Sequence, residues 1–162
     1  MTQDGINLSI YRRKSRLFVA PGVLTLRGFQ DIKLIAVAED RDGLLHALET
    51  AEQLALELTA AKPRDKRVVG QPKLDWSVAG VASWSKFVSS GTTQVGVLRM
   101  GDKSELVYWV PDGEGGLIGT ILKQKLKGKV PLTKIAAAVI AMFERADREK
   151  PRIETVDDLD DE

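Results

Sequence analysis

Cysteine is absent from this chain of 162 residues, and histidine occurs once, as His46. Without cysteine there are no disulfides, no thiolate zinc sites and no cysteine nucleophiles. A single histidine does not suffice for the usual zinc or transition-metal site. A Ser-His-Asp triad would have to use His46, and no serine stands in a G-x-S-x-G turn between a strand and a helix. We therefore expect a protein without catalytic residues, metal or cofactor.

Long hydrophobic runs are also missing, since the longest apolar stretches have about ten residues and a transmembrane helix needs about twenty. The first residues, Met1 to Gly5, carry neither the basic nor the apolar region of a secretory signal. These absences predict a cytoplasmic protein. Hydrophobic residues at 43% and charged residues at 29% match a folded globular protein, and the length fits one domain.

Charge is unevenly distributed along the chain. Lys and Arg number 24 and Asp and Glu number 23, but residues 154–162 hold six carboxylates and no basic residue. The preceding residues therefore have a clear basic excess. We interpret residues 154–162 as a disordered, solvated acidic tail; the alternative is a tail that competes with nucleic acid for the basic part of the chain.

Apolar periodicity predicts strands followed by a helix in the first part of the chain. The expected strands are Ile6–Tyr11, Leu17–Ala20 ended by Pro21-Gly22, Val23–Leu26 and Asp31–Val37. The following helix is capped by Asp40 or Asp42 and ends near Ala61. One stripe of this helix is apolar: Leu44, Leu48, Ala51, Ala55 and Leu58.

A connection at residues 62–75 leads to a second part with the same order of features. Ser83–Phe87 predicts a short amphipathic helix. Strands are expected at Gln94–Met100, Leu106–Val110 and Leu117–Lys129, with a loop at Gly113–Gly116. A final helix is capped by Thr133 and ends near Lys150-Pro151, and its apolar stripe is Ile135, Val139, Met142 and Ala146.

The two parts match in pattern. LSIYRRKSRLFVAP in the first part corresponds to VGVLRMGDKSELVYWVP in the second, and each is followed by an extended run and a helix. The expected fold class is α+β, with two repeated sheet-then-helix units, each made of antiparallel strands followed by a helix. The units span about residues 5–61 and 76–150. They pack as one domain, residues 1–153, because each unit alone would expose a sheet face and a helix stripe.

Lysines alternate along Ile121–Val130. If this segment is a strand, four lysines share one face at about 7 Å spacing, which suits a nucleic-acid backbone: Lys123, Lys125, Lys127 and Lys129. The aromatic residues that could stack on bases, if exposed, are Tyr11, Tyr108 and Trp109. The other interpretation is an edge strand that its lysines protect against aggregation.

The second half of the chain contains SWSKFVSSGTTQVGVLRMGDKSELVYWVPDGEGGLIG, followed by a lysine-rich stretch and then by PLTKIAAAVIAMFERA. This order of features resembles the second half of immunity proteins from bacterial contact-dependent growth inhibition systems. In that family a Ser-Trp-x-x-Phe helix precedes two strands, a Gly-rich loop and an Ala-rich closing helix. The resemblance covers most of residues 5–148. It implies a bacterial, cytoplasmic immunity protein that binds and neutralises the toxic C-terminal domain of a secreted effector, often a nuclease, and needs no catalytic residue.

Binding residues in that family do not lie in a fixed motif, so charge alone gives the expected interface. Carboxylates would complement a basic nuclease, and the expected toxin-binding residues are Glu49, Glu52, Glu57, Asp112 and Glu114. The duplicated plan also resembles the Whirly-type fold, which binds single-stranded nucleic acid, and Lys127-Gly128-Lys129 is similar to a lysine-glycine-lysine motif of plant Whirly proteins. The alternative function is therefore a single-stranded nucleic-acid-binding module that uses the lysine-rich strand face.

Overall fold

The computed structural model describes residues 6–13, 16–25, 28–31, 36–38, 40–60, 91–100, 102–114 and 116–153, without the side chains of 23–25, 28–31, 36–38 and 57–60. Three expectations lie outside these residues: the connection at 62–75, the short helix at 83–87 and the acidic tail at 154–162. Within the described residues, no helix is both long enough and apolar enough to span a bilayer.

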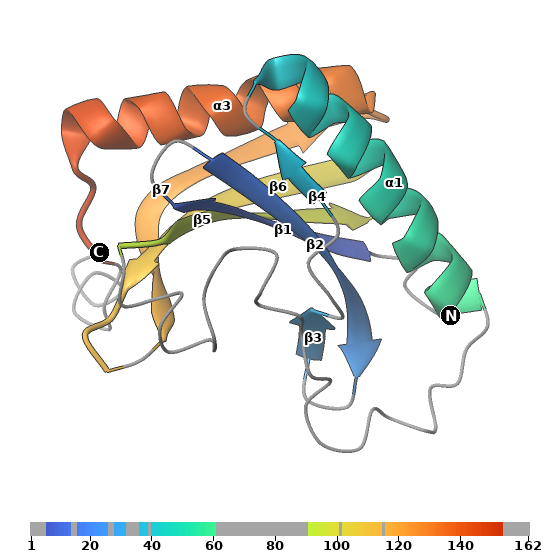
Figure 1. Cartoon of the computed structure of the whole chain (residues 1–162), viewed down its shortest axis with the longest axis horizontal. Helices are drawn as coiled ribbons and strands as arrows, with labels where there is room; N and C mark the ends of the chain where they lie inside the picture. Colours follow the sequence, from blue (N-terminus) through green and yellow to red (C-terminus); the bar gives the residue numbers. More distant parts are fainter. Residues whose placement is uncertain are drawn as a thin grey trace.

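Strands and helices follow one another in the α+β manner that the sequence predicts (Figure 1). The elements are β1 (Ile6–Arg13), β2 (Arg16–Thr25), β3 (Gly28–Asp31), β4 (Ala36–Ala38), α1 (Arg41–Ala60), β5 (Thr93–Met100), β6 (Lys103–Pro111), β7 (Leu117–Lys127) and α3 (Leu132–Glu149). The strands form one antiparallel sheet in the order β3-β2-β1-β5-β6-β7, with β4 also paired to β2. Among the described strands, β7 is therefore one edge of the sheet.

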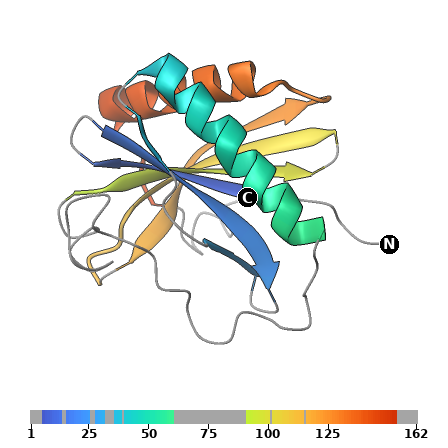
Figure 2. The same ribbon diagram turned by 45° about the vertical axis from the view of Figure 1, so that its right-hand side comes forward.

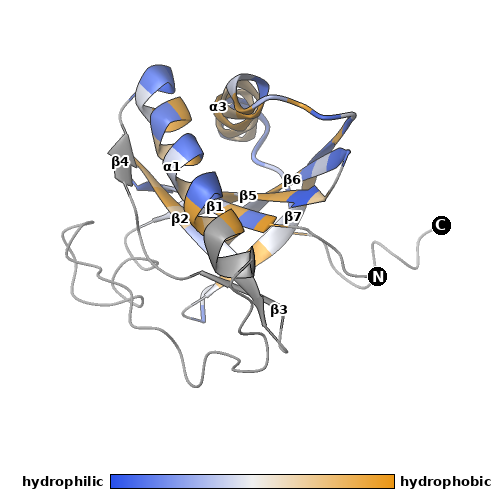
Figure 3. Cartoon of the chain, turned by 90° about the vertical axis from the view of Figure 1, so that its right-hand side faces the viewer, coloured by the Kyte–Doolittle hydropathy of each residue, from blue (hydrophilic) through white to orange (hydrophobic). Residues whose placement is uncertain are grey.

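Both helices cover the same face of the sheet (Figures 1 and 2). Helix α1 packs on β1, β2 and β4, whereas α3 packs on β5 and β6, and the two helices also contact each other. Viewed from the side, the helices form one layer above the sheet (Figure 3). The other face of the sheet points away from them, and its side chains are buried on β1, at Ser9 and Tyr11, but exposed along β7.

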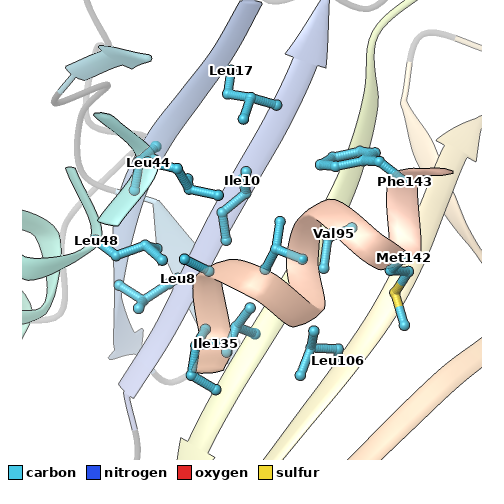
Figure 4. Packing of buried hydrophobic residues seen from close by; sticks show 14 of the residues in the cluster. Leu8, Ile10, Leu17, Leu44, Leu48, Val95, Leu106, Ile135, Met142 and Phe143 are labelled. Atoms are coloured by element: carbon cyan, nitrogen blue, oxygen red, sulfur yellow. The ribbon is translucent and has the colours of Figure 1, made fainter. Parts of the chain in front are cut away.

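The hydrophobic core fills the space between the two layers (Figure 4). Leu8 and Ile10 of β1 are fully buried there, and Ser9 and Tyr11, which alternate with them, are buried on the opposite face, so β1 is covered on both faces. The predicted stripe of α1 is confirmed for Leu44, Leu48, Ala51 and Ala55, and the side chain of Leu58 lies outside the description. All four predicted stripe residues of α3 are buried: Ile135, Val139, Met142 and Ala146.

The helix ends confirm two of the expected boundaries and correct a third. Asp40 caps α1, because its Oδ1 accepts a hydrogen bond from the Gly43 N–H at 2.8 Å. Lys150 ends α3 in the left-handed conformation, with φ of 49°. The prediction that Thr133 caps α3 is wrong: the helix starts at Leu132, and Pro131 takes the N-cap position with no side-chain cap. Proline suits this place because its carbonyl accepts from the Ile135 N–H while its fixed φ sets the extended entry.

The predicted end of the second strand at Pro21-Gly22 is also wrong, since β2 continues through both residues to Thr25. The outer neighbour of β2 changes at this point. β4 pairs with Leu17–Val19 and β3 pairs with Gly22–Thr25, so Pro21 falls between the two ladders. Its missing N–H therefore removes no hydrogen bond to either of these strands. Residues 23–25 of the short strand expected at 23–26 are the last part of β2. Of the strand expected at 31–37, Asp31 ends β3, residues 36 and 37 belong to β4, and residues 32–35 lie outside the described residues.

Candidate nucleic-acid interface

Half of the side chains of β6 and β7 point away from the helices. Leu106, Tyr108 and Leu122 belong to the core, so the residues that alternate with them lie on the opposite face of the sheet. We call one group of these residues the basic sheet face: Lys103, Trp109, Ile121, Lys123, Lys125 and Lys127. Glu105 and Val107 lie among them.

Three of the four lysines from the expected strand face stand on β7. Lys123, Lys125 and Lys127 occupy alternate positions of the strand, and all three are exposed. Lys129 does not continue the row, because β7 ends at Lys127 and Gly128 follows with φ of 82°. This left-handed turn leads the chain toward α3.

An irregularity in the pairing of β6 with β7 leaves Ile121, on the outward face, without a partner on β6. Val107 pairs with Lys123 but Trp109 pairs with Gly119, so β7 has more residues than β6 between these two pairs. The Thr120 hydroxyl holds the bulge together: it donates to the Tyr108 carbonyl at 2.9 Å and accepts from the Leu122 N–H at 3.1 Å. Ile121 has no opposite residue on β6 and is 44% exposed.

Of the three aromatic residues considered for stacking, only Trp109 lies on the basic sheet face. Tyr108 points into the core, where its ring meets Phe143 edge-to-face at 6.0 Å between centroids. Tyr11 is 3% exposed and Tyr108 is 5% exposed, so neither offers a ring to a ligand. Trp109 is half-buried and is flanked by glycine on both neighbouring strands, Gly96 and Gly119.

Like charges face each other at one end of the basic sheet face. Lys103 pairs directly with Lys127 in the register of β6 and β7, and both side chains are exposed. Directly opposed like charges destabilise a sheet. Lys125 has an acidic neighbour, because Glu105 lies 3.9 Å away, but this pair is exposed and therefore weak. The part of the chain that the structure describes gives no carboxylate to Lys103 or Lys127.

The five carboxylates expected to bind a toxin do not form one surface. Glu52 makes an ion pair of 2.7 Å with Arg99, and both side chains are 21% exposed. Arg99 also donates to the Val130 carbonyl, so this pair ties α1 to β5 and to the segment before α3. Glu49 is exposed on α1, and Glu57 lies in α1 with its side chain outside the description.

Asp112 and Glu114 lie at the other end of the sheet. Arg99, the partner of Glu52, pairs with Ser104 near the start of β6, whereas the Asp112 loop follows the end of that strand at Pro111. The separation along the strand is about 23 Å at the usual rise per residue. The Asp112 carboxylate accepts hydrogen bonds from the N–H groups of Glu114 and Gly116, and these bonds lower its pKa. Asp112 thus holds its own loop in shape.

The outer side of α1 presents one apolar residue among polar ones. Leu56 is 47% exposed, and Glu49 and Gln53 lie on the same helical stripe, seven and three residues before it. His46, the single histidine, is exposed on this helix as well. Among the residues with described side chains, no group of three His, Asp or Glu residues gathers as a metal site would require.

A separate charged cluster connects β1 with α3. The Arg12 guanidinium donates two hydrogen bonds to Asp147, at 2.9 and 2.6 Å, and lies over the Phe143 ring at 4.6 Å from its centroid. The hydrogen bonds from Arg12 hold the pKa of Asp147 below its usual value. This cluster is accounted for by its structural role.

No protein-family model matches the chain, and no curated protein is significantly similar to it in sequence.

Proposed function

We propose that the protein is a non-catalytic nucleic-acid-binding module that holds the phosphate backbone on the basic sheet face. The observation that carries the proposal is the direct opposition of Lys103 and Lys127, both exposed and without a described carboxylate. A phosphate between the two ammonium groups would convert a repulsion into two attractions. Lys125 continues the row on β7 at about 7 Å, a spacing that lets successive phosphates be contacted.

Protection against aggregation explains only part of this arrangement. Lysines on an edge strand prevent other strands from pairing with it, and Lys123, Lys125 and Lys127 could serve this purpose on β7. Lys103 does not fit that explanation, because β6 is an inner strand with β5 and β7 on its two sides. Its exposed ammonium group adds positive charge to the basic sheet face but does not protect an edge strand from pairing with another strand.

The test is the salt dependence of binding to a labelled single-stranded oligonucleotide of about 20 nucleotides, measured by fluorescence anisotropy. The triple variant K103Q/K125Q/K127Q should bind more weakly, and the slope of log K against log salt should become shallower by about 2. The matched control R41Q/K134Q/R148Q removes the same charge from exposed helix positions and should keep the wild-type slope. Equal losses in the two variants would show that net charge, and not this face, causes the binding.

A second candidate function is the neutralisation of a toxin domain by an immunity protein. The observation in its favour is Leu56 on the outer side of α1, an exposed apolar residue on the same stripe as Glu49. Protein interfaces commonly place such an apolar anchor within a charged rim. An acidic rim would attract a basic toxin such as a nuclease.

The two functions can be separated in the native host. A one-to-one protein partner that survives high salt, and whose C-terminal domain kills cells unless this chain is co-expressed, would support the immunity function. In that case E49K/L56D should lose protection while K103Q/K125Q/K127Q keeps it. Full protection by E49K/L56D would remove the α1 surface from consideration. The immunity function would require a location in the bacterial cytoplasm.

The order of the elements also supports a proposed internal duplication, with an arrangement similar to the Whirly fold. β1 and β5 each begin a run of strands that ends in a helix, and they pair with each other antiparallel in the sheet. Both helices lie on the same face of the sheet. A two-fold rotation axis passing between β1 and β5 is the relation that a duplication would leave, and superposition of the two halves of an experimental structure tests it.

A further inference from the structure

The indole of Trp109 extends across the sheet between two glycines. A Cβ atom placed on Gly96 of β5 would lie 3.2 Å from the indole Nε1, and one placed on Gly119 of β7 would lie 4.0 Å from Cε3 and Cζ3. The pyrrole edge of the ring therefore lies toward β5 and the benzene edge toward β7. A ring that reaches both neighbouring strands lies across the sheet instead of standing away from it.

Glycine at Gly96 makes room for this orientation, whereas a methyl group at Gly119 would make only ordinary contacts with the ring. Any side chain at Gly96 would press on the indole, because 3.2 Å is closer than ordinary van der Waals contact. Gly96 and Gly119 stand within strands, where glycine weakens the sheet unless another group must approach closely. Here the approaching group is an aromatic ring.

The ring borders the lysines on the same face. Val107 and Lys123 form the next outward pair along β6 and β7, and the bulge places the exposed Ile121 between Lys123 and the ring. Beyond Lys123 the face continues with Lys125 and then with the opposed lysines of β6 and β7. Within the described residues, the indole N–H of Trp109 makes no hydrogen bond.

We infer that the basic sheet face takes single-stranded nucleic acid, with an unpaired base stacked on Trp109 and the backbone running along the lysines. The inference rests on the proposed function and specifies its ligand. Bases in a duplex are stacked on each other and cannot reach a ring that lies across a sheet, whereas an unpaired base presents its full face. Stacking of this kind is tolerant of base identity, so no strict sequence preference is expected.

The experiment compares three ligands on the full-length protein: a 20-nucleotide oligo(dT), a 20-base-pair duplex and inorganic polyphosphate. Oligo(dT) should bind tightest to the wild type. The variant W109L should lose about tenfold in affinity for oligo(dT) and keep its affinity for polyphosphate, whereas W109F should retain most of the oligo(dT) affinity. Urea denaturation shows whether each variant is folded.

A measurement on the unaltered sequence covers the case in which W109L does not fold. The chain contains three tryptophans. With 5-fluorotryptophan incorporated, the 19F resonance that is missing in W109F belongs to Trp109, and it should shift on addition of oligo(dT) but not of polyphosphate.

Each result has a distinct meaning. Equal losses of oligo(dT) and polyphosphate binding in W109L, or an unmoved Trp109 resonance at saturating oligo(dT), would overturn the stacking inference and leave the phosphate-binding face in place. Equal affinity for duplex and single strand would overturn the single-strand preference. Absence of binding to every nucleic acid at low salt would overturn the proposed function itself.

Discussion

Lys103 and Lys127 stand directly opposite each other on neighbouring strands, with both ammonium groups on the outward face of the sheet. Two like charges in this position lower stability in the absence of a ligand. This pair is unfavourable for folding but favourable for anion binding. A substitution here should therefore change stability and binding in opposite directions, which makes the pair the most direct test of the basic sheet face.

Replacing Lys127 with Glu should therefore move stability and binding in opposite directions. K127E creates an attractive pair with Lys103 and should raise the free energy of unfolding by about 0.5 kcal/mol. The same change should weaken oligonucleotide binding. Urea denaturation and fluorescence anisotropy measure the two effects. The control K129E lies beyond the end of β7 and should give no gain in stability. A loss of stability in K127E would contradict the assigned opposition.

Removing the carboxylate of Glu105 should strengthen binding. Glu105 lies 3.9 Å from Lys125 on the basic sheet face and competes with phosphate for that lysine. We expect E105Q to raise the affinity for oligo(dT) by about threefold at 0.1 M salt, because one more ammonium group can contact a phosphate. E144Q, at an exposed position of α3, is the matched control and should bind as the wild type does. An unchanged affinity in E105Q would mean that Lys125 does not contact the ligand.

Two alanine substitutions test the position of the indole. G96A should lower the free energy of unfolding by about 1–2 kcal/mol, because the added methyl group lies 3.2 Å from Nε1 and the ring must move. G119A adds its methyl group at 3.7–4.0 Å from Val107 and Trp109, an ordinary contact, and should change stability by less than about 0.5 kcal/mol. Denaturation curves of both proteins check the difference. Similar losses in the two variants would contradict the ring position.

Acid should weaken the contact between β1 and α3. The pKa of Asp147 is lowered in the folded state by its hydrogen bonds from Arg12. A lowered pKa contributes stability above the unfolded value of about 3.9, and this contribution is lost as the pH falls through the folded pKa. The wild type should therefore lose more stability than D147N between pH 5 and pH 3. Because the Asp147 side chain is 58% exposed, solvent screening keeps the difference small. If the free energies of unfolding of the two proteins changed with pH in parallel, the Arg12–Asp147 contact would not contribute to the pH dependence of stability.

Features that depend on local periodicity were predictable from the sequence. The apolar stripes of α1 and α3 follow from the helical repeat alone, and Leu44 and Val139 are buried as that repeat requires. The cap at Asp40 follows from short-range chemistry in the same way. Pro21 was misjudged because the effect of a proline depends on which strand lies beside it, and that neighbour comes from elsewhere in the chain.

Which residues come together in the candidate site depends on strand and ion pairing more than on the local sequence pattern. Charge alone grouped Glu52 with Asp112, but the ion pair of Glu52 with Arg99 and the strand register place these two carboxylates at opposite ends of the sheet. The contribution of Lys103 was missed because its position opposite Lys127 depends on the register of β6 and β7, which the bulge sets. A usable signal for Trp109 was present in the sequence as glycine inside two expected strands, Gly96 and Gly119.

The pairing of β1 with β5 sets the order of events on the ribosome. Arg12 lies opposite Thr93 and Ile6 opposite Arg99, so the ladder joins the start of the chain to a segment translated much later. Until β5 has left the exit tunnel, β1 keeps an unpaired edge beside its apolar residues, Leu8 and Ile10. Long-range pairing of this kind folds slowly. A nascent chain that stops after α1 is thus a natural client for chaperones, and truncated products should aggregate instead of accumulating as half-domains.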